Sequence, residues 1–292
     1  MPKIDHAGVS SLEPKDRLLY WIKERHNIYL RKQVGKLKPW TADPILQRWF
    51  FTNPYRENDK VTVWVRENIR QRMVKEEPAT LLFALIAFRW FNTILTGSRL
   101  LHNGWLTVWN ADAVIDYLGD CKEDGDQIFT GAFMIHGGTK SGSKLMDVCR
   151  GHIQAAWDRR YELCKDLRCT TLENAHKVLS SLPGMGGTGF MAAQVVCDLK
   201  YTALLAGVTD WWTWCSSGPG SLRGMAIIEG KPESKNRFAV RVNGLRSWIN
   251  KELTRYGMSP LHCQDMQSCL CEFSKYERAR AGGRNKRTYP GS

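Results

Sequence analysis

The sequence predicts an all-α protein. Apolar residues recur at the three- and four-residue spacing of helices along most of the 292 residues, and no stretch alternates as a long strand would. No internal repeat or low-complexity linker divides the chain. Its length allows one large domain, 1–292, in two packed helical lobes. We place these lobes at about residues 17–165 and 166–262, with a basic C-terminal segment at 263–292.

The expected helices follow one another from the N-terminus. Residues 16–34 present one apolar face. Asp43 is a suitable N-cap, and Pro44 suits the first position of a helix over 44–51. Residues 79–92 are apolar on nearly all sides, which is typical of a helix at the centre of a bundle. We expect further helices at residues 60–75, 110–118, 145–164, 171–182 and from about 190 onward.

A loop of glycine, serine and lysine at residues 137–144 superficially resembles a phosphate-binding loop. Such a loop needs Gly, four residues, then Gly-Lys-Ser/Thr before a helix, yet Gly142 is followed by Ser143. A nucleotide-hydrolysing kinase site also needs a β-strand, which the helical pattern does not offer. We expect a flexible basic loop here, after a short non-helical segment at 129–135.

Positive charge is in excess and is clustered. The chain has 42 Lys and Arg residues against 29 Asp and Glu, a formal net charge of +13. A basic surface attracts polyanions, of which nucleic acid is the commonest, and the 12 Trp and 9 Tyr residues suit the stacking of bases. The alternative is a basic tail that only increases solubility. The clusters are Arg31, Lys32, Lys36 and Lys38, and Lys275, Arg278, Arg280, Arg284, Lys286 and Arg287.

Several classes of protein are not expected. The longest apolar run, 81–91, contains Arg89 and is too short to span a membrane, and the polar residues 1–11 do not form a secretory signal. We therefore expect a soluble intracellular protein with reduced cysteines and no membrane partner. The group His262, Cys263, Cys269 and Cys271 fits neither zinc nor iron–sulfur spacing, so neither a metal nor another cofactor is expected.

The most informative stretch is the glycine-rich turn Leu182–Gly189 between two predicted helices. Glycines let a backbone approach another closely, and N–H groups at a helix start favour anions. With Leu182, Pro183, Gly184 and Gly186 in place, the turn resembles the helix-hairpin-helix element of DNA repair glycosylases. The competing interpretation is a plain turn between core helices. The candidate DNA contacts are Gly184, Gly186, Gly187 and Thr188.

In the glycosylase superfamily, an aspartate at the base pocket follows the hairpin by a little over twenty residues. Asp210 lies 24 residues past Gly186, whereas Asp198 lies only 12 residues past it. The resemblance therefore implies that Asp210 is the catalytic carboxylate, with Asp198 as the alternative. The lysine of lyase-type glycosylases has no counterpart after Gly186, so Schiff-base strand cleavage is not expected.

Three further segments narrow the resemblance: Pro39–Thr62, Gly218–Gly224 and Cys271–Arg278. Together with the hairpin, they resemble the phage-type thymine-hypermodification proteins. That group comprises the α-glutamyl/putrescinyl-thymine pyrophosphorylases (amino acid:DNA transferases) and the helical domain associated with 5-hydroxymethyluracil DNA kinases. The resemblance spans about residues 17–290. It implies a two-lobed, DNA-glycosylase-like helical fold and a location in the cytoplasm of an infected bacterium.

The resemblance also implies chemistry on a flipped base of double-stranded DNA. An amine or amino acid co-substrate would displace phosphate or pyrophosphate from a 5-(phospho/pyrophospho)methyl-uracil. Asp210 could deprotonate the amine, and Ser221, Arg223 and the turn at Gly218 and Gly220 could stabilise the leaving group. Other hypermodification enzymes are further candidate partners.

Two charged groups have more than one interpretation. Arg56, Glu57 and Asp59 could bind substrate or could form a structural ion-pair network between lobes. Lys275, Tyr276 and Arg278 suit contacts with the DNA phosphate backbone better than catalysis.

Two other functions remain open. The chain could be a monofunctional DNA glycosylase for a modified pyrimidine, with Asp210 assisting departure of the base. It could also be a non-catalytic DNA-binding helical module that partners a 5-hydroxymethyluracil DNA kinase.

Overall fold

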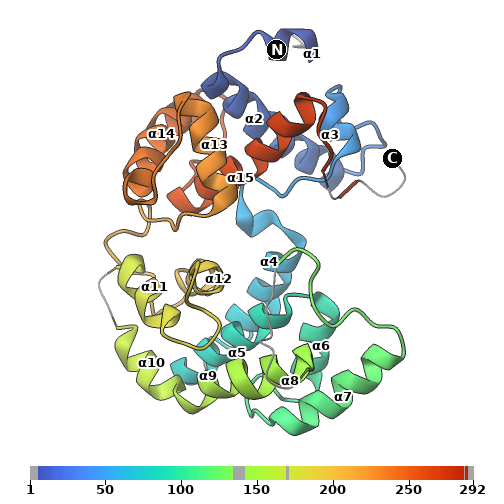
Figure 1. The fold of residues 1–292 in the computed structure, drawn as a ribbon, viewed down its shortest axis with the longest axis vertical. Coiled ribbons are helices and arrows are strands. Elements are labelled where there is room, and N and C mark those ends of the chain that lie inside the picture. The colour runs from blue at the N-terminus through green and yellow to red at the C-terminus, as the bar shows by residue number, and fades with distance from the viewer. Residues whose placement is uncertain (1–5, 134–141, 169–170, 286, 289–292) are drawn as a thin grey trace. The chain divides into compact units, whose positions relative to one another are not determined.

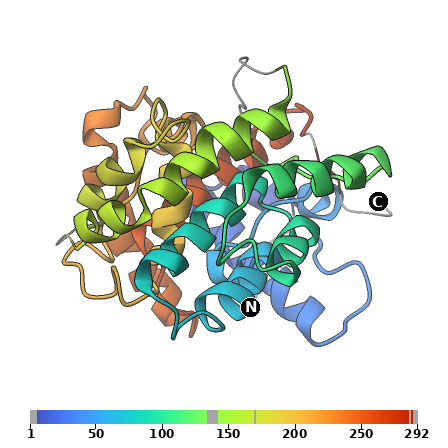
Figure 2. The same cartoon turned by 90° about the horizontal axis from the view of Figure 1, so that it is seen from below.

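The computed structural model describes residues 6–133, 142–168, 171–285 and 287–288 (Figures 1 and 2). Within these residues the regular structure is helical, and strand-like pairing is limited to an isolated antiparallel bridge between Trp49 and Thr288. The all-α prediction is confirmed. Most of the 137–144 loop lies outside the described residues.

The chain forms two compact units. Unit 1 consists of residues 1–59 and 212–292, and unit 2 consists of residues 60–211. These limits differ from the lobes expected from the sequence, because the N-terminal helix packs with helices from the end of the chain. Such long-range pairing leaves no mark on local periodicity.

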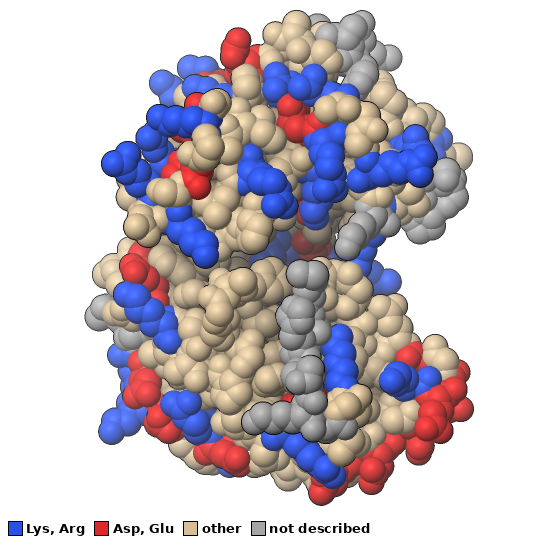
Figure 3. All heavy atoms as spheres, viewed as in Figure 1, with Lys and Arg blue, Asp and Glu red and all other residues tan. Residues whose placement is uncertain are grey.

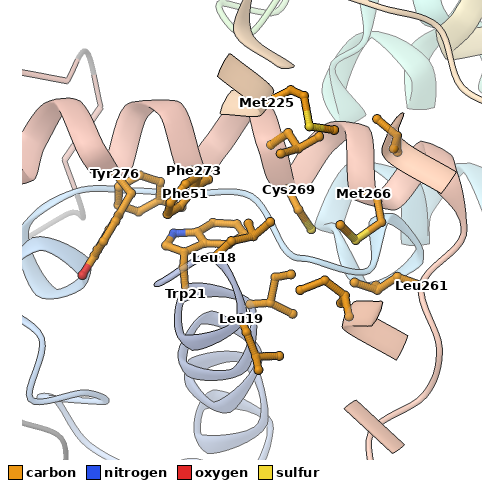
Figure 4. Packing of buried hydrophobic residues seen from close by; sticks show 14 of the residues in the cluster. Leu18, Leu19, Trp21, Phe51, Met225, Leu261, Met266, Cys269, Phe273 and Tyr276 are labelled. Atoms are coloured by element: carbon orange, nitrogen blue, oxygen red, sulfur yellow. The ribbon is translucent and has the colours of Figure 1, made fainter. Parts of the chain in front are cut away.

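Helix α15 (Cys263–Arg280) is the central element of unit 1. Around it pack α2 (Pro14–Gln33), α3 (Pro44–Arg48), α13 (Pro219–Glu229) and α14 (Lys235–Arg255). Figure 4 shows the core between α2 and α15, where the Trp21 and Phe51 rings meet edge to face at 6.1 Å between centroids. Phe51 meets Tyr276 of α15 in the same geometry at 6.2 Å. Unit 1 also contains α1 (His6–Ser10) and a 3-10 turn, η1 (Arg56–Asn58).

Two glycines allow α13 to lie against α15. A Cβ added to Gly224 would overlap the backbone carbonyl of Leu270, and one added to Gly220 would overlap the side chain of Cys271. Because the interior is closely packed, α13 and α15 would have to move apart to make room for such an atom. The Gly218–Gly224 motif is therefore, at least in part, a helix-packing motif.

Helix α5 (Pro78–Phe91) is the central element of unit 2. Twelve of its 14 residues are buried, which agrees with the central position expected from its all-round apolarity. Its Arg89 reaches Asp198 of α12 (Phe190–Leu199) through two hydrogen bonds of 2.5 and 2.6 Å. Besides α12, helix α5 packs against η2 (Arg66–Arg70), α6 (Ile94–His102), η3 (Asp147–Ile153), α9 (Gln154–Asp158) and α10 (Arg160–Asp166). The unit also contains α4 (Lys60–Val65), α7 (Ala111–Glu123), α8 (Lys144–Met146) and α11 (Leu172–Ser180).

The expected helices occur close to their predicted places. Asp43 caps α3 by accepting from the backbone of Ile45 and Leu46, as the Asp-Pro pair indicated. The sequence reasoning missed α1, α6, α13, α14 and α15. The long helices α14 and α15 carry many polar residues, so their apolar stripes are weak. None of the helices in the described part of the chain is long and apolar enough to cross a membrane.

Candidate functional site

In unit 1, a segment at residues 52–59 runs antiparallel along one face of α15. The backbone N–H of Thr52 donates to Glu272, and that of Arg56 donates to Asp265 at 3.1 Å. Between them, the thiol of Cys269 points at the carbonyl of Pro54 at 3.7 Å. Polar side chains one helical turn apart thus hold this segment in place.

Asp59 joins the end of this segment to its start by hydrogen bonds with Asn53. Its Oδ1 accepts from the backbone N–H of Asn53 at 3.0 Å and from the Asn53 amide at 2.9 Å. Burial raises the pKa of the Asp59 carboxyl above its ordinary value, while these hydrogen bonds and the charges of Arg25 and Arg56 oppose the shift. A carboxyl group held in this way can serve as a proton donor or acceptor nearer neutrality than a free aspartate.

An imidazole of α2 lies beside the same segment. The His26 ring meets the Tyr55 ring edge to face at 4.9 Å between centroids. Burial, with the charge of Arg25 as a second cause, lowers the pKa of His26, so the ring is neutral at pH 7. The Tyr55 hydroxyl is fixed by donating to the carbonyl of Ser259 at 2.6 Å.

A second imidazole begins α15. His262 is the N-cap, and its Nδ1 accepts from the backbone N–H of Asp265 at 3.1 Å. Its Nε2 therefore carries the proton and lies 3.2 Å from the Asp265 carboxylate. The His262–Asp265 pair thus orients the carboxylate that holds Arg56.

We call these residues the polar cluster of unit 1. Its chemistry combines a neutral imidazole, a carboxyl group of raised pKa and two guanidinium groups, and perturbed groups of this kind gather at functional sites. In the part of the chain that the structure describes, no three His, Cys, Asp or Glu residues are grouped to hold a metal ion. The members of the cluster are Arg25, His26, Tyr55, Arg56, Glu57, Asp59, His262 and Asp265.

The sequence brought Arg56, Glu57 and Asp59 to attention, and the structure places them in this cluster. Tyr55 was also noted beside these charges, whereas Arg25, His26, His262 and Asp265 were missed as members. The His262–Asp265 pair carried only a weak local signal, since histidine is not among the preferred N-cap residues. His26 and Arg25 carried none, because only packing brings α2 to the segment.

Ser221 and its turn have structural partners. Ser221 is fully buried. Its hydroxyl donates to the Gly218 carbonyl and accepts from the Gly218 N–H, both at 3.0 Å, and also accepts from Gln267 at 3.3 Å. Gly220 packs on Cys271. Arg223, by contrast, is exposed on α13. Of this group, Arg223 is the member with a side chain open to a ligand.

The two candidate carboxylates, Asp210 and Asp198, both lie in unit 2 and have different surroundings. Asp210 is half-buried and accepts from the backbone N–H groups of Leu172 at 2.5 Å and Glu173 at 3.1 Å, at the start of α11. Asp198 is fully buried against Arg89. Asp210 is the more accessible of the two, although it already stabilises a helix start.

The glycine-rich turn has a packed side and an open side. Gly184 has φ +75°, and an added Cβ would lie 2.7 Å from Trp90 and 2.8 Å from His152. Gly186 approaches the carbonyl of Ser180, whereas Gly187, at φ +66°, has nothing within 4 Å of an added Cβ. Gly187 and Thr188 are exposed. The turn thus has a core-packing role at Gly184 and a free surface at Gly187 and Thr188.

In the basic C-terminal segment, the residues that follow α15 fold back on that helix. Lys275 pairs with Glu272 at 2.5 Å, and Arg278 donates to Asn285 at 2.6 Å. The Asn285 amide in turn donates to the carbonyl of Lys275. Part of the positive charge of this segment is therefore paired with other groups of the protein. Tyr276, expected to contact phosphate, is instead fully buried and donates to Asp43 at 2.7 Å.

Comparison with known proteins identifies relatives. The family described as "5-hmdU DNA kinase, helical domain" matches residues 13–285. A curated protein, the 5-hmdU DNA kinase of Bacillus phage SP10, is 24% identical over 286 aligned positions. The match covers 88% of this chain but 44% of the phage protein, so the chain spans less than half the length of that relative. No solved structure matches. With a family match over nearly its whole length, the chain belongs to the family of 5-hmdU DNA kinase helical domains.

Proposed function

We propose that this protein acts on a 5-substituted uracil in double-stranded DNA and replaces the phosphate of a 5-phosphomethyl or 5-pyrophosphomethyl group by an amine or amino acid. The observation that carries the proposal is the polar cluster of unit 1. It occurs in a chain whose family is described as the helical domain of a 5-hmdU DNA kinase. No Gly-x4-Gly-Lys-Ser/Thr motif occurs in the 292 residues. Group transfer at the base therefore fits these residues better than phosphoryl transfer from a nucleotide.

The proposed step balances as a substitution at the carbon attached to uracil C5. The amine nitrogen bonds to the methylene carbon, the carbon–oxygen bond breaks, and phosphate or pyrophosphate leaves with the electron pair. A cation stabilises that anionic leaving group, which suits Arg56 or the exposed Arg223. The amine loses a proton to a base, for which a neutral imidazole such as His26 has the right protonation state.

Asp210 remains a candidate for the base. The hydrogen bonds from Leu172 and Glu173 leave each of its oxygens a further lone pair. Ser221, Gly218 and Gly220 are less suitable as direct contacts, because their groups are used within the fold.

DNA would be held by two sets of residues. Gly187 and Thr188, with Gly184 and Gly186 shaping the turn, would offer backbone N–H groups to a phosphate as a helix-hairpin-helix element does. Lys275 and Arg278 would add positive charge from unit 1.

The test is mass spectrometry of the nucleosides released from 5-phosphomethyluracil DNA after incubation with the protein and a mixture of amines. An amino-substituted nucleoside supports the proposal. A free modified base contradicts it in favour of the glycosylase, and unchanged DNA contradicts it in favour of a non-catalytic module. The structural hydrogen bonds of Asp210 and Ser221 are the observation that favours the non-catalytic module as the second candidate.

Variants separate the two candidate bases. His26→Gln and Asp210→Asn each remove a base while retaining hydrogen-bonding groups, so the true base should lose roughly 100-fold or more in turnover. Exposed His102→Gln and Asp158→Asn are matched controls. If turnover survives both substitutions, leaving-group stabilisation carries the reaction, and Arg223→Gln becomes the informative variant.

A further inference from the structure

Unit 1 also contains a pocket of about 740 Å³ between the end of α2 and α3. None of its lining residues belongs to the polar cluster. Ile28 and Leu46 give it apolar walls, the Trp40 indole gives it an aromatic surface, and Lys38 and Arg48 give it positive charge. Among the described residues, those that line the pocket include no carboxylate. Pockets of ~300–1,000 Å³ with mostly apolar walls and few polar groups are typical of small-molecule sites.

Trp40 is held in a defined position although it is only half-buried. Its Nε1 donates to the carbonyl of Lys36 at 2.6 Å, and its own carbonyl accepts from Arg31. Arg31 is in turn anchored to Glu24 at 2.9 Å. An aromatic ring fixed by hydrogen bonds loses little conformational freedom when a flat ligand stacks on it.

Positive charge accumulates around this ring. The Nζ atoms of Lys32 and Lys38 lie 4.7 and 5.3 Å from the ring centroid of Trp40. Burial lowers the pKa of the Lys32 ammonium, and the neighbouring charges of Arg25 and Lys38 lower it further. Mutual repulsion of this kind is relieved when an anion binds.

Asp43, which lies between the lining residues Thr41 and Pro44 in the chain, is already satisfied by the fold. Asp43 accepts hydrogen bonds through Oδ1 and Oδ2 from four partners: the backbone N–H groups of Ile45 and Leu46 and the hydroxyls of Tyr20 and Tyr276. Its charge is thus directed into the protein rather than toward the lysines. The pocket is left with an aromatic plane beside cations.

We propose that this pocket binds one nucleotide, with the base stacked on Trp40 and the phosphate held by Lys38 and Arg48. A planar aromatic group with an adjacent phosphate matches both features of the site. The same chemistry is presented by a free nucleotide and by one unit of a single strand of DNA. The site is independent of the base chemistry proposed above, because it shares no residue with the polar cluster.

The test uses two probes and the full chain. Thymidine 5′-monophosphate is titrated by calorimetry, and a short fluorescein-labelled oligothymidylate is titrated by fluorescence anisotropy. Trp40→Ala should weaken binding of at least one probe about 10-fold or more, within the range known for loss of one base-stacking ring. Trp40→Phe should restore much of that binding, since it keeps an aromatic face. The double variant Lys38→Gln, Arg48→Gln should also weaken it.

The matched control is Trp248→Ala. Trp248 is a half-buried tryptophan of unit 1 with the Lys15 ammonium 3.9 Å over its ring, but it does not line the pocket. Loss with both probes identifies a free-nucleotide site, and loss with the oligothymidylate alone identifies a strand site; either supports the proposal. The proposal is overturned if Trp40→Ala, or Trp40→Phe should the alanine variant unfold, binds both probes as Trp248→Ala does. It is also overturned if inorganic phosphate competes as well as the nucleotide, because the base would then contribute nothing.

Discussion

The two units of this protein differ sharply in charge. Unit 1 contains 25 Lys and Arg residues against 13 Asp and Glu, whereas unit 2 contains 17 against 16. Nearly all of the net charge of +13 therefore belongs to unit 1. On the face shown in Figure 3, Lys and Arg are spread over the unit that contains α13–α15, while acids gather over α7 of the other unit. Those acids on α7 include Asp112, Asp116, Asp120 and Glu123.

This difference bears on how DNA would be held. Charge attracts DNA without regard to sequence, whereas a hairpin backbone offers directed N–H donors and little charge. The glycine-rich turn lies in the nearly neutral unit 2, and the basic segment around Arg278 lies in unit 1. We therefore expect general affinity to come from unit 1 and positioning to come from unit 2.

The units also use buried charge differently. In unit 2 the Arg89–Asp198 pair is almost completely buried, with side-chain exposures of 2% and 0%. In unit 1, the buried Glu277 is shared between Arg17 and Arg280, both at 2.9 Å. A buried pair is costly to break because the remaining charge is stranded without water. Loss of Asp198, the more deeply buried of the two carboxylates, should therefore be especially costly.

The largest expected effect follows from that pair. Asp198→Ala leaves the Arg89 guanidinium buried without its partner and should lower the free energy of unfolding by about 3–5 kcal/mol. Urea denaturation of the variant and the parent measures this. Asp112→Ala is the control, because its pair with Arg150 is exposed and should contribute less than about 1 kcal/mol. Equal losses in the two variants would mean that burial does not make the Arg89–Asp198 pair costlier to break than an exposed pair.

The second prediction concerns the turn in unit 2. Gly187→Ala introduces a side chain at φ +66° into open space, which strains the backbone while leaving the charge unchanged. If the turn donates to a DNA phosphate, the Kd for duplex DNA should rise about 10-fold, as for loss of a hydrogen bond to a charged group. The matched control is Gly230→Ala in unit 1, at φ +67° and equally open. A similar Kd for both variants would mean that the hairpin does not contact DNA.

The third prediction concerns unit 1. Arg278→Gln combined with Arg284→Gln should make the dependence of DNA affinity on salt less steep, by about 0.9 in the log–log slope for each phosphate that the variant no longer neutralises. The equivalent pair in unit 2, Lys122→Gln with Lys165→Gln, should leave the slope as it is. Binding isotherms at several salt concentrations measure both. An unchanged slope in the unit 1 variant would mean that its basic segment only increases solubility.

The smallest expected effect is on pH dependence. Because the pKa of His26 is lowered in the folded protein, the unfolded chain takes up a proton below about pH 6.5 that the folded imidazole resists. Unit 1 should therefore lose stability as pH falls through this range, and His26→Gln should lose less. The raised pKa of Asp59 acts in the opposite sense and keeps the effect small. Unfolding curves at pH 7.5 and pH 5 compare the two, with exposed His102→Gln as the control. A steeper loss in His26→Gln would contradict the assignment of a neutral imidazole.

Part of the candidate site was predictable, and part was not. Arg56, Glu57 and Asp59 are notable in the sequence because charges are dense there between apolar segments. Their partners His26 and Asp265 lie far away along the chain and meet them only through the packing of α2 and α15. Ser221 shows that a local pattern can also mislead. A serine after a Pro-Gly turn suits anion binding, but here its hydroxyl bonds to the N-cap residue Gly218 and stabilises the start of α13.

The sequence by itself determined the helical class, the start of α3 at Asp43 and Pro44, and the excess of positive charge. These properties depend on local spacing, on residues a few positions apart and on composition, which folding does not change. The tertiary structure alone decided that residues 1–59 join 212–292, that Asp198 is buried with Arg89 while Asp210 lies at a helix start, and that Gly224 faces Leu270. Each of these depends on which distant surfaces bury one another, and burial, rather than sequence position, determines whether a carboxylate supports the fold or meets a ligand.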